Sequence, residues 1–390
     1  MTTDLSNFAR RVRDFIQRCA TGFSAASEPG SRDSEFNDLA VALFRLQFSG
    51  NAPYRRWCEA QGVTAEAVTQ WGQIPAVPTA AFKEWDLTCL TPAERTRVFH
   101  SSGTTTQQPS RHFHHADSLA LYEASLWPWL KRHLPLTATK ARFLSLTPST
   151  EQAPHSSLVH MFDFARQKMG ASANGFVGQT DADGTWWLDF DRAFALLGGS
   201  TTACAVKGNT DSQPWLVLGT AFSFVQLLDE MERRDGRLCL PNGSFVLETG
   251  GYKGRSRALP KASLYQLIAE RLGVPETNII CEYGMSELSS QAYDLMGRPG
   301  AAEASLDARE SSRRRVFQFP PWARVRVISP ETGQEVDEGE TGLLQIFDLA
   351  NVFSVLAVQT EDLAVRRSFG FELLGRAVAA EPRGCSLMSA

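Results

Sequence analysis

Hydrophobic residues near the N-terminus recur at the spacing of amphipathic helices. The first such set is Phe8, Val12, Phe15, Ile16 and Cys19, and the second is Phe36, Leu39, Ala40, Leu43 and Phe44. Steps of three and four residues place each set on one helical face. The Pro, Gly and Ser residues of ASEPGSRDS predict a loop between the two helices. We therefore expect residues 1–95 to form a mainly helical lead-in packed on the core.

From about residue 96, short apolar segments alternate with helical patterns. The apolar segments are RVFH, ARFLSL, PWLVLG, SFVLET and NIICEY, and helical periodicity covers 158–169, 222–233 and 261–272. Short buried strands that alternate with helices predict an α/β fold with a largely parallel sheet. Ligands bind at the carboxyl ends of such strands. Residues 96–320 are thus expected to form an α/β region that binds ligands at the ends of its strands.

The pattern changes again after residue 320. ARVRVISPETGQEV and TGLLQIFDL alternate polar and apolar residues on either side of the turn PETG. This alternation predicts an antiparallel hairpin, which we expect to belong to a small antiparallel β barrel. An antiparallel β subdomain is therefore assigned to residues 321–375, and residues 376–390 form a short C-terminal tail that contains Cys385.

The amino-acid composition and the net charge are those of an ordinary globular protein. The 390 residues are 43% hydrophobic and 21% charged, with a formal net charge of -4. This balance is typical of a globular protein and argues against nucleic acid as a partner. The N-terminal MTTDLSNFARRVRDF is too charged for a signal peptide, and no apolar run reaches the roughly 18 residues of a membrane span.

The cysteines bear on metal binding and on compartment. The seven cysteines are scattered along the chain, and none of them forms a CxxC pair. A zinc site and a disulfide framework are therefore not expected, and most of the thiols are interpreted as core residues. This usage is typical of a reducing compartment, so we expect a cytoplasmic protein.

The stretch HSSGTTTQQPSRH carries the first candidate chemistry. Its hydroxyl groups can donate hydrogen bonds, and Gly103 allows backbone N–H groups to approach an anion closely. The loop follows an expected strand, which favours phosphate binding, although a polar surface loop explains the same residues. It lacks the GK[ST] ending of a P-loop, so a P-loop NTPase is disfavoured.

Three further signals follow in order along the chain. In EYGMSE, the Glu287 carboxylate and the Ser286 hydroxyl suit a metal-bound phosphate, whereas the alternative is a helix N-cap by Ser286 or Ser289. In TEDLA, Asp362 at a strand end can accept both ribose hydroxyls, or it is a turn aspartate. In GR, Arg376 can reach a phosphate or ribose, or it lies on the surface.

The order of these motifs resembles that of the adenylate-forming superfamily. More closely, the chain resembles the LuxE-type acyl-protein synthetases from about residue 36 to its end. The resemblance rests on YRRWCEA, IPAVPTAAFK, SLTPS with PHSSL, TGGYKGRSR, YGMSELSSQ and RGCSL. It implies that the protein activates a carboxylic acid with ATP and Mg²⁺, which gives an acyl-adenylate and pyrophosphate. It also implies that residues 96–320 are the α/β nucleotide- and acyl-binding region of a large N-terminal domain, whose usual C-terminal lid is missing or reduced to a tail.

The resemblance assigns a role to each motif. Glu287 would bind Mg²⁺ with Ser286 beside the α-phosphate, Asp362 would accept the ribose hydroxyls, and Arg376 would reach ribose or phosphate. His155 would gate the acyl pocket, although a histidine at a helix start is the alternative. The residues that would hold the phosphates are Ser101, Ser102, Gly103, Thr104, Thr105 and Thr106, and those that would line the adenine slot are Gly250, Gly251, Tyr283 and Gly284.

This sequence departs from the superfamily at its lysines. Members usually carry a lysine after the phosphate loop, where this chain has Arg111, which is always charged and binds phosphate in a bidentate manner. A second lysine, which stabilises the α-phosphate from the C-terminal lid, also has no counterpart, and Lys83 or Lys253 could supply that charge. Which residue replaces the lysine of the loop stays open.

The acyl acceptor separates the remaining alternatives. The resemblance implies transfer of a fatty acyl group to the Cys385 thiol and then to an acceptor, which is a reductase, a carrier protein or coenzyme A. The first alternative is an acyl-CoA or amide ligase of the same superfamily, which needs no acylated cysteine. The second is a binding module of the same fold that lacks turnover. The sequence does not identify the acid.

Overall fold

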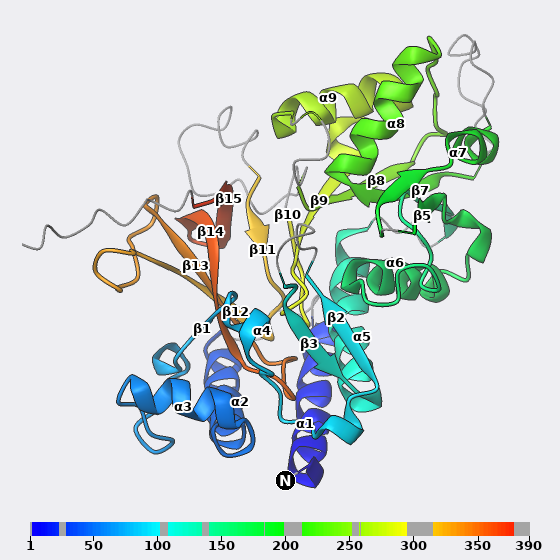
Figure 1. Cartoon of the computed structure of the whole chain (residues 1–390). Helices are drawn as coiled ribbons and strands as arrows, with labels where there is room; N and C mark the ends of the chain where they lie inside the picture. The colour runs from blue at the N-terminus through cyan, green and yellow to red at the C-terminus, as the bar shows by residue number, and fades with distance from the viewer. Residues whose placement is uncertain are drawn as a thin grey trace, which may run out of the picture.

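One continuous sheet organises the computed structural model, which describes residues 2–22, 29–101, 108–134, 140–182, 184–198, 213–251, 257, 259–294 and 315–377. In this part of the chain the strand order is β12-β13-β14-β15-β11-β10-β9-β8-β7-β4, and β1 pairs with β14 (Figure 1). The strands are β1 Val77–Pro78, β4 Arg142–Ser145, β7 Trp215–Thr220, β8 Phe245–Thr249, β9 Ile279–Tyr283, β10 Ala292–Asp294, β11 Phe317–Gln318, β12 Ala323–Ile328, β13 Thr341–Asp348, β14 Ala357–Arg367 and β15 Gly370–Arg376.

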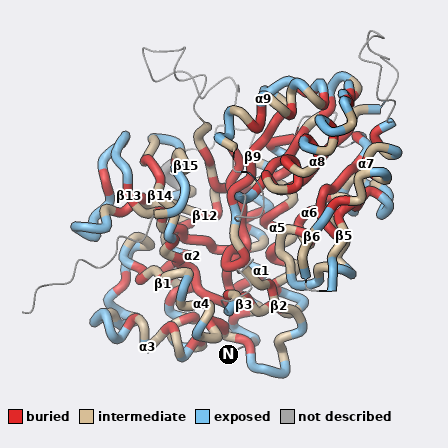
Figure 2. The backbone as a smooth tube through the Cα atoms, turned by 45° about the horizontal axis from the view of Figure 1, so that its top comes forward, coloured by how far each residue is buried: buried red, intermediate tan, exposed pale blue. Residues whose placement is uncertain are grey.

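Four parallel strands, β4, β7, β8 and β9, form the half of the sheet that the α/β pattern predicted. Successive side chains on β7 point to opposite faces, since Val217 packs in one hydrophobic cluster and Leu216 and Leu218 pack in the other. Helices α8 (Ala221–Arg233) and α9 (Lys261–Leu272) contribute to the first cluster, whereas α5 (Ala116–His133) and α6 (Ser157–Lys168) contribute to the second. The parallel strands are therefore buried on both faces, and Figure 2 shows the run of buried residues along β9.

Local signals placed several of these elements correctly. The structure has a helix at Lys261–Leu272, and Gly273 ends it in the left-handed conformation with φ 68°. The hairpin expected around PETG is present, because β12 and β13 pair antiparallel with Ala323 opposite Asp348. Strands β10 and β11 join this antiparallel part to the parallel strands through β9 and β15, so both belong to one sheet. The expected α/β fold is thus confirmed.

The N-terminal helices are α1 Thr2–Thr21, α2 Pro29–Gly50, α3 Ala52–Ala60 and α4 Ala81–Glu84. The apolar residues predicted to share a face are buried, and α1 lies beside α5 (Figure 1). Helix α2 contacts the antiparallel half of the sheet through Gln47, whose side-chain amide donates to the Asn351 carbonyl at 2.8 Å. The expected loop ASEPGSRDS is too long, because α2 begins at Pro29, and proline is favoured in the first helical turn.

The strand expected at RVFH does not belong to the large sheet. Strand β2 (Arg97–His100) pairs antiparallel with β3 (Arg111–His114), and these two strands form a separate two-stranded sheet. A second small pair consists of β5 (Gly178–Thr180) and β6 (Trp186–Leu188), which precede α7 (Phe190–Leu197). The hydroxyl-rich stretch thus connects the two strands of a hairpin, whereas the α/β pattern had placed it after a strand of the main sheet.

Two further expectations concern membranes and cysteines. Among the described residues, no helix has both the length and the apolar character required to cross a membrane. Cys19, Cys58, Cys89 and Cys281 are free thiols. Cys239 is disulfide-bonded, so its interpretation as an unpaired core residue is wrong.

Candidate functional site

The β2–β3 hairpin holds the ends of the hydroxyl-rich loop together. The Ser101 N–H donates to the Ser110 carbonyl at 3.2 Å, and the Ser110 N–H donates to Ser101 Oγ at 3.0 Å. These two bonds fix the base of the loop. Ser101 is thus placed at the base, whereas Ser102, Gly103, Thr104, Thr105 and Thr106 lie outside the described residues.

A cluster of three oxygen-bearing side chains lies at this base. Ser110 Oγ donates to Glu287 Oε1 at 2.5 Å, and Ser286 Oγ donates to Glu287 Oε2 at 3.0 Å. The two serine oxygens are 3.4 Å apart, and all three side chains are buried. A carboxylate with neighbouring hydroxyls is an oxygen donor set of the kind that Mg²⁺ binds. The residues therefore fit the metal that the sequence motif implied.

The segment that carries Glu287 is a loop between β9 and β10, and it does not begin a helix. The alternative in which Ser286 or Ser289 caps a helix is therefore wrong. The other end of this loop is held by Asp348, whose carboxylate accepts from the backbone N–H groups of Ser289 at 2.9 Å and Ser290 at 2.8 Å. Asn351 also donates to the Glu287 carbonyl at 3.0 Å.

His112 makes a second contact between the hairpin and this loop. Its Nδ1 lies 2.8 Å from the Ser286 carbonyl oxygen, so this nitrogen carries the hydrogen and donates it. Burial lowers the pKa of His112 to about 4, which keeps the ring neutral at neutral pH. The orientation of Glu287 is thus determined by contacts to its backbone on both sides and by hydroxyl groups at its carboxylate.

Asp362 and Tyr283 come together on the antiparallel side of the site. The Tyr283 hydroxyl donates to Asp362 Oδ2 at 2.7 Å. Asp362 lies inside β14, opposite Arg376 of β15 and next to a register shift, so its expected position at a strand end is wrong. Burial raises the pKa of Asp362, and the Tyr283 hydrogen bond and the Arg376 charge lower it. Arg376 Nε is 3.9 Å from Asp362 Oδ1, and its side chain is 81% exposed.

Aromatic rings surround Tyr283 on the same side. The Tyr283 ring lies 5.5 Å from Phe371 and 6.2 Å from both Phe317 and Phe319, measured between ring centroids. The glycine pair that follows β8 is Gly250 and Gly251, and no described atom lies within 4 Å of a Cβ added at either position. Gly284 follows Tyr283, and a Cβ there would lie 2.4 Å from Glu282 Oε1. An aromatic wall and a glycine pair are features of a site for a planar ring.

Arg111 is the first residue of β3 in the hairpin, and His155 lies beside the hairpin. Arg111 Nη1 is 3.0 Å from Asp86 Oδ1, and the other oxygen of Asp86 accepts from Arg95 at 2.6 Å. The His155 ring stacks on His100 with centroids 4.8 Å apart, and its Nδ1 lies 3.1 Å from the Val98 carbonyl. Both residues thus contact the strands that hold the loop. Lys253 and Cys385 lie outside the described residues.

Sequence reasoning missed Ser110, His112, Asp348 and Asn351. A usable signal exists for the first two, since SRHFH places Ser110, His112 and His114 at every second position, and all three are buried. This alternation indicates a strand with a polar inner face, which needs polar partners. The roles of Asp348 and Asn351 depend on long-range contacts and leave no local pattern.

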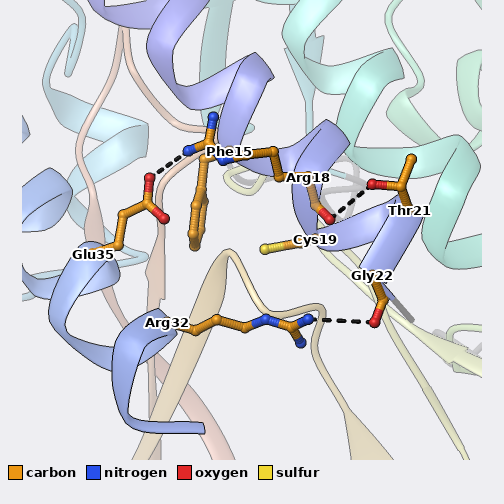
Figure 3. Close-up of a pocket in the computed structure, with 7 residues that line it drawn as sticks. All are labelled: Phe15, Arg18, Cys19, Thr21, Gly22, Arg32 and Glu35. Atoms are coloured by element: carbon orange, nitrogen blue, oxygen red, sulfur yellow. Dashed lines mark hydrogen bonds and ion pairs between the residues drawn. The ribbon is translucent and has the colours of Figure 1, made fainter. Parts of the chain in front are cut away.

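Two cavities in the described part of the chain lie away from these residues. One, of about 350 Å³, lies between α1 and α2, and Figure 3 shows the Arg18–Glu35 ion pair and the hydrogen bond from Arg32 to the Gly22 carbonyl. The other, of about 450 Å³, lies at the start of β4 and β7, where Arg142 stacks on Trp215 at 3.9 Å. Neither cavity is lined by Ser101, Glu287 or Asp362.

Comparison with known proteins identifies the fold. No protein-family profile and no curated protein matches the sequence. The structure is similar to 2-hydroxyisobutyryl-CoA ligase in an open conformation with 2-HIB-AMP and CoA, at 12% identity and a TM-score of 0.58, over 87% of this chain and 69% of the ligase. It is also similar to that ligase in the postadenylation state with 2-HIB-AMP, at 13% identity and a TM-score of 0.59, over 90% and 71%. The chain therefore shares the fold of this acyl-CoA ligase.

Proposed function

We propose that this protein activates a carboxylic acid with ATP and forms an acyl-adenylate and pyrophosphate. The observation that carries the proposal is the contact of Ser110 with Glu287 at the base of the hydroxyl-rich loop. It joins the expected phosphate loop to the expected metal ligand, although 177 positions separate the two residues. The fold supports the proposal, because the similar ligase is a protein that binds an acyl-adenylate, 2-HIB-AMP.

Each residue of the candidate site has a proposed role in adenylation. Glu287 would hold Mg²⁺, and the ion would supply positive charge to the phosphates of ATP. Asp362 accepts hydrogen bonds from the ribose hydroxyls after its hydrogen bond from Tyr283 rearranges. Arg376 lies close enough to Asp362 to reach the ribose or a phosphate as well. The aromatic residues around Tyr283 pack against the adenine. The hydroxyls of Ser101 to Thr106 bind the β- and γ-phosphates, and Arg111 provides positive charge nearby.

The finer proposal follows the resemblance to LuxE-type acyl-protein synthetases. The acid is a fatty acid, and the acyl group moves to the Cys385 thiol. The thiolate attacks the acyl carbonyl, the bond to the phosphate oxygen breaks, and AMP leaves. The thioester then passes the acyl group to a reductase, a carrier protein or coenzyme A. His155 borders the acyl pocket, and Lys83 or Lys253 stabilises charge at the α-phosphate.

Direct transfer to coenzyme A is the second candidate function. The similar ligase binds CoA together with its acyl-adenylate, and this favours an acceptor thiol that is not part of the protein. Both candidates share the adenylation half-reaction. They differ in whether an acyl group is ever attached to the chain.

The test is exchange of labelled pyrophosphate into ATP with a panel of carboxylic acids, which ranges from short hydroxy acids to long fatty acids. Exchange that depends on one class of acid and on Mg²⁺ is the expected result. Exchange with none of the acids, by a protein that unfolds cooperatively, would contradict adenylation and favour a binding module without turnover.

A further inference from the structure

Among the described residues, no cation lies against the buried Glu287 carboxylate. Its side chain is 5% exposed, and no ion pair to it exists in the described part of the chain. Its partners are two neutral hydroxyls, from Ser110 and Ser286. A buried carboxylate is stabilised by hydrogen bonds, but removal of its charge from water is still expensive unless a cation compensates. In the described part of the chain, the site thus offers oxygen ligands and contains no cationic side chain.

Ser110 cannot move its oxygen far from this carboxylate. Both of its backbone hydrogen-bonding groups are engaged with Ser101 at the base of the loop. Ser110 is 1% exposed, and it begins the buried face that continues with His112 on β3. Only rotation about the side-chain bond is left to it, so the hydroxyl oxygen stays within reach of the Glu287 oxygens.

The spacing of the oxygens suits an octahedral ion. Mg²⁺ binds oxygens at about 2.0–2.1 Å, which puts neighbouring ligand oxygens roughly 3 Å apart. The observed separations are 2.5 Å from Ser110 Oγ to Glu287 Oε1, 3.0 Å from Ser286 Oγ to Glu287 Oε2, and 3.4 Å between the serine oxygens. These values bracket the spacing that the metal needs.

We propose that Ser110 is a second protein ligand of the metal ion that Glu287 holds. This inference rests on the proposed function, because the ion is the one that accompanies ATP. Without the ion, the hydroxyl proton points at the carboxylate. With the ion, the hydroxyl rotates, its lone pair faces the metal, and its proton is donated to a phosphate oxygen or to water. Serine ligates the metal as a neutral hydroxyl, and no covalent bond changes.

Ser110 lies where the base of the hydroxyl-rich loop meets Glu287. Ser110 closes the loop that is expected to bind the phosphates and also touches Glu287. A metal ligand at this point would connect the metal site to the base of that loop.

The direct test is Mn²⁺ binding by electron paramagnetic resonance, with ATP present and no acid, so that no turnover occurs. Ser110→Ala is expected to weaken Mn²⁺ binding at least about tenfold, a loss typical of damaged metal sites. Ser110→Thr keeps the hydroxyl and is expected to retain binding. Ser244→Ala removes another buried hydroxyl, one that accepts from the Trp215 N–H, and serves as the matched control. Wild-type affinity in Ser110→Ala would overturn the proposal.

A second variant distinguishes a ligand from a residue that only orients Glu287. Ser110→Cys keeps the size of the side chain but replaces a hard oxygen with a soft sulfur, which favours Cd²⁺ over Mg²⁺. The expected result is a shift in metal preference towards Cd²⁺ of at least tenfold relative to wild type. An unchanged preference would overturn direct ligation even if Ser110→Ala fails to fold.

The outcomes separate this inference from the proposed function. If Mn²⁺–ATP binding depends on Ser110 but no acid supports pyrophosphate exchange, the metal site stands and adenylation is wrong. If exchange is found and Ser110→Ala binds Mn²⁺ normally, adenylation stands and the inference is wrong.

Discussion

Tyr283 donates a 2.7 Å hydrogen bond to Asp362, which lies 79 positions further along the chain. The bond joins β9, the last parallel strand, to β14 in the antiparallel half of the sheet. Both residues are expected to contact the nucleotide, one at the adenine and the other at the ribose. Their hydrogen bond therefore links the two halves of the proposed nucleotide site.

The Tyr283→Phe variant tests this link. Loss of the hydroxyl removes a hydrogen bond that favours the charged carboxylate, so the pKa of Asp362 should rise further above its ordinary value. A net hydrogen bond of about 1 kcal/mol corresponds to a rise of roughly half to one pH unit. The acid limb of the pH dependence of KM for ATP is expected to move to higher pH by that amount. Tyr293→Phe is the control, because the buried Tyr293 hydroxyl has no hydrogen-bond partner among the described residues. An equal displacement in both variants would refute the link.

Glu287→Gln should lower the adenylation rate at least about tenfold, a loss of roughly 1.4 kcal/mol in transition-state stabilisation. The amide oxygen of glutamine can still accept from Ser110, so the fold should persist while the charge that attracts the metal is lost. Pyrophosphate exchange measures the rate, and thermal unfolding checks the fold. A folded variant with the wild-type rate would eliminate the metal role.

Arg111→Ala should raise KM for ATP more than KM for the acid if the guanidinium acts on the phosphates. In the structure Arg111 shares Asp86 with Arg95, which makes Arg95→Ala a matched control. Loss of Arg95 leaves the charge of Arg111 in place, so KM for ATP is expected to change little. Steady-state kinetics measure KM for ATP and KM for the acid. Equal changes in both KM values, or none, would show that another residue supplies the positive charge.

The stability of the protein should depend on Glu282. Burial raises the pKa of this carboxyl from 4.5 to about 7, and its hydrogen bond from Thr249 offsets only part of that rise. Between these two values the folded state keeps the proton and the unfolded chain loses it. The contribution of Glu282 to stability is therefore present below about pH 4.5 and is lost as pH rises to about 7.

Glu282→Gln removes this titration. Relative to wild type, its free energy of unfolding should gain on the order of 3 kcal/mol between about pH 4.5 and pH 7, as measured by urea unfolding. Glu361→Gln, at an exposed position, should reproduce the wild-type pH dependence. If the free energy of unfolding of Glu282→Gln depends on pH in the same way as that of the wild type, the Glu282 carboxyl is ionised in the folded protein.

Cys385 should become acylated when the protein turns over an acid with ATP. A thiolate attacks an acyl-adenylate readily, and Arg383, two positions before Cys385 in the sequence, would favour the thiolate. Intact mass spectrometry should detect an adduct that neutral hydroxylamine removes. In Cys385→Ser the labile adduct should disappear while pyrophosphate exchange persists. A labile adduct in that variant, or none in the wild type with an acid that supports exchange, would favour direct transfer to coenzyme A.

Local sequence determined the elements whose causes are local. The period of Lys261–Leu272 with Gly273 at its end, and the alternation around PETG, each depend on neighbouring residues, and the structure agrees with both. The order of the motifs likewise identified Glu287 and Asp362 as candidate site residues. Backbone conformation and side-chain direction follow from short-range sterics and burial, so a short window of residues is enough to predict them.

Tertiary structure alone decided which residues meet. Strand β2 pairs with β3 and is separate from the main sheet, and Asp362 lies within β14 instead of at its end. Ser110 reaches Glu287 across 177 positions, and Asp348 holds the loop after Glu287 from β13. Such contacts are set by strand order and register, which depend on the packing of the whole chain. No single segment contains that information, so the motifs identified candidate site residues but not the residues that contact them in the fold.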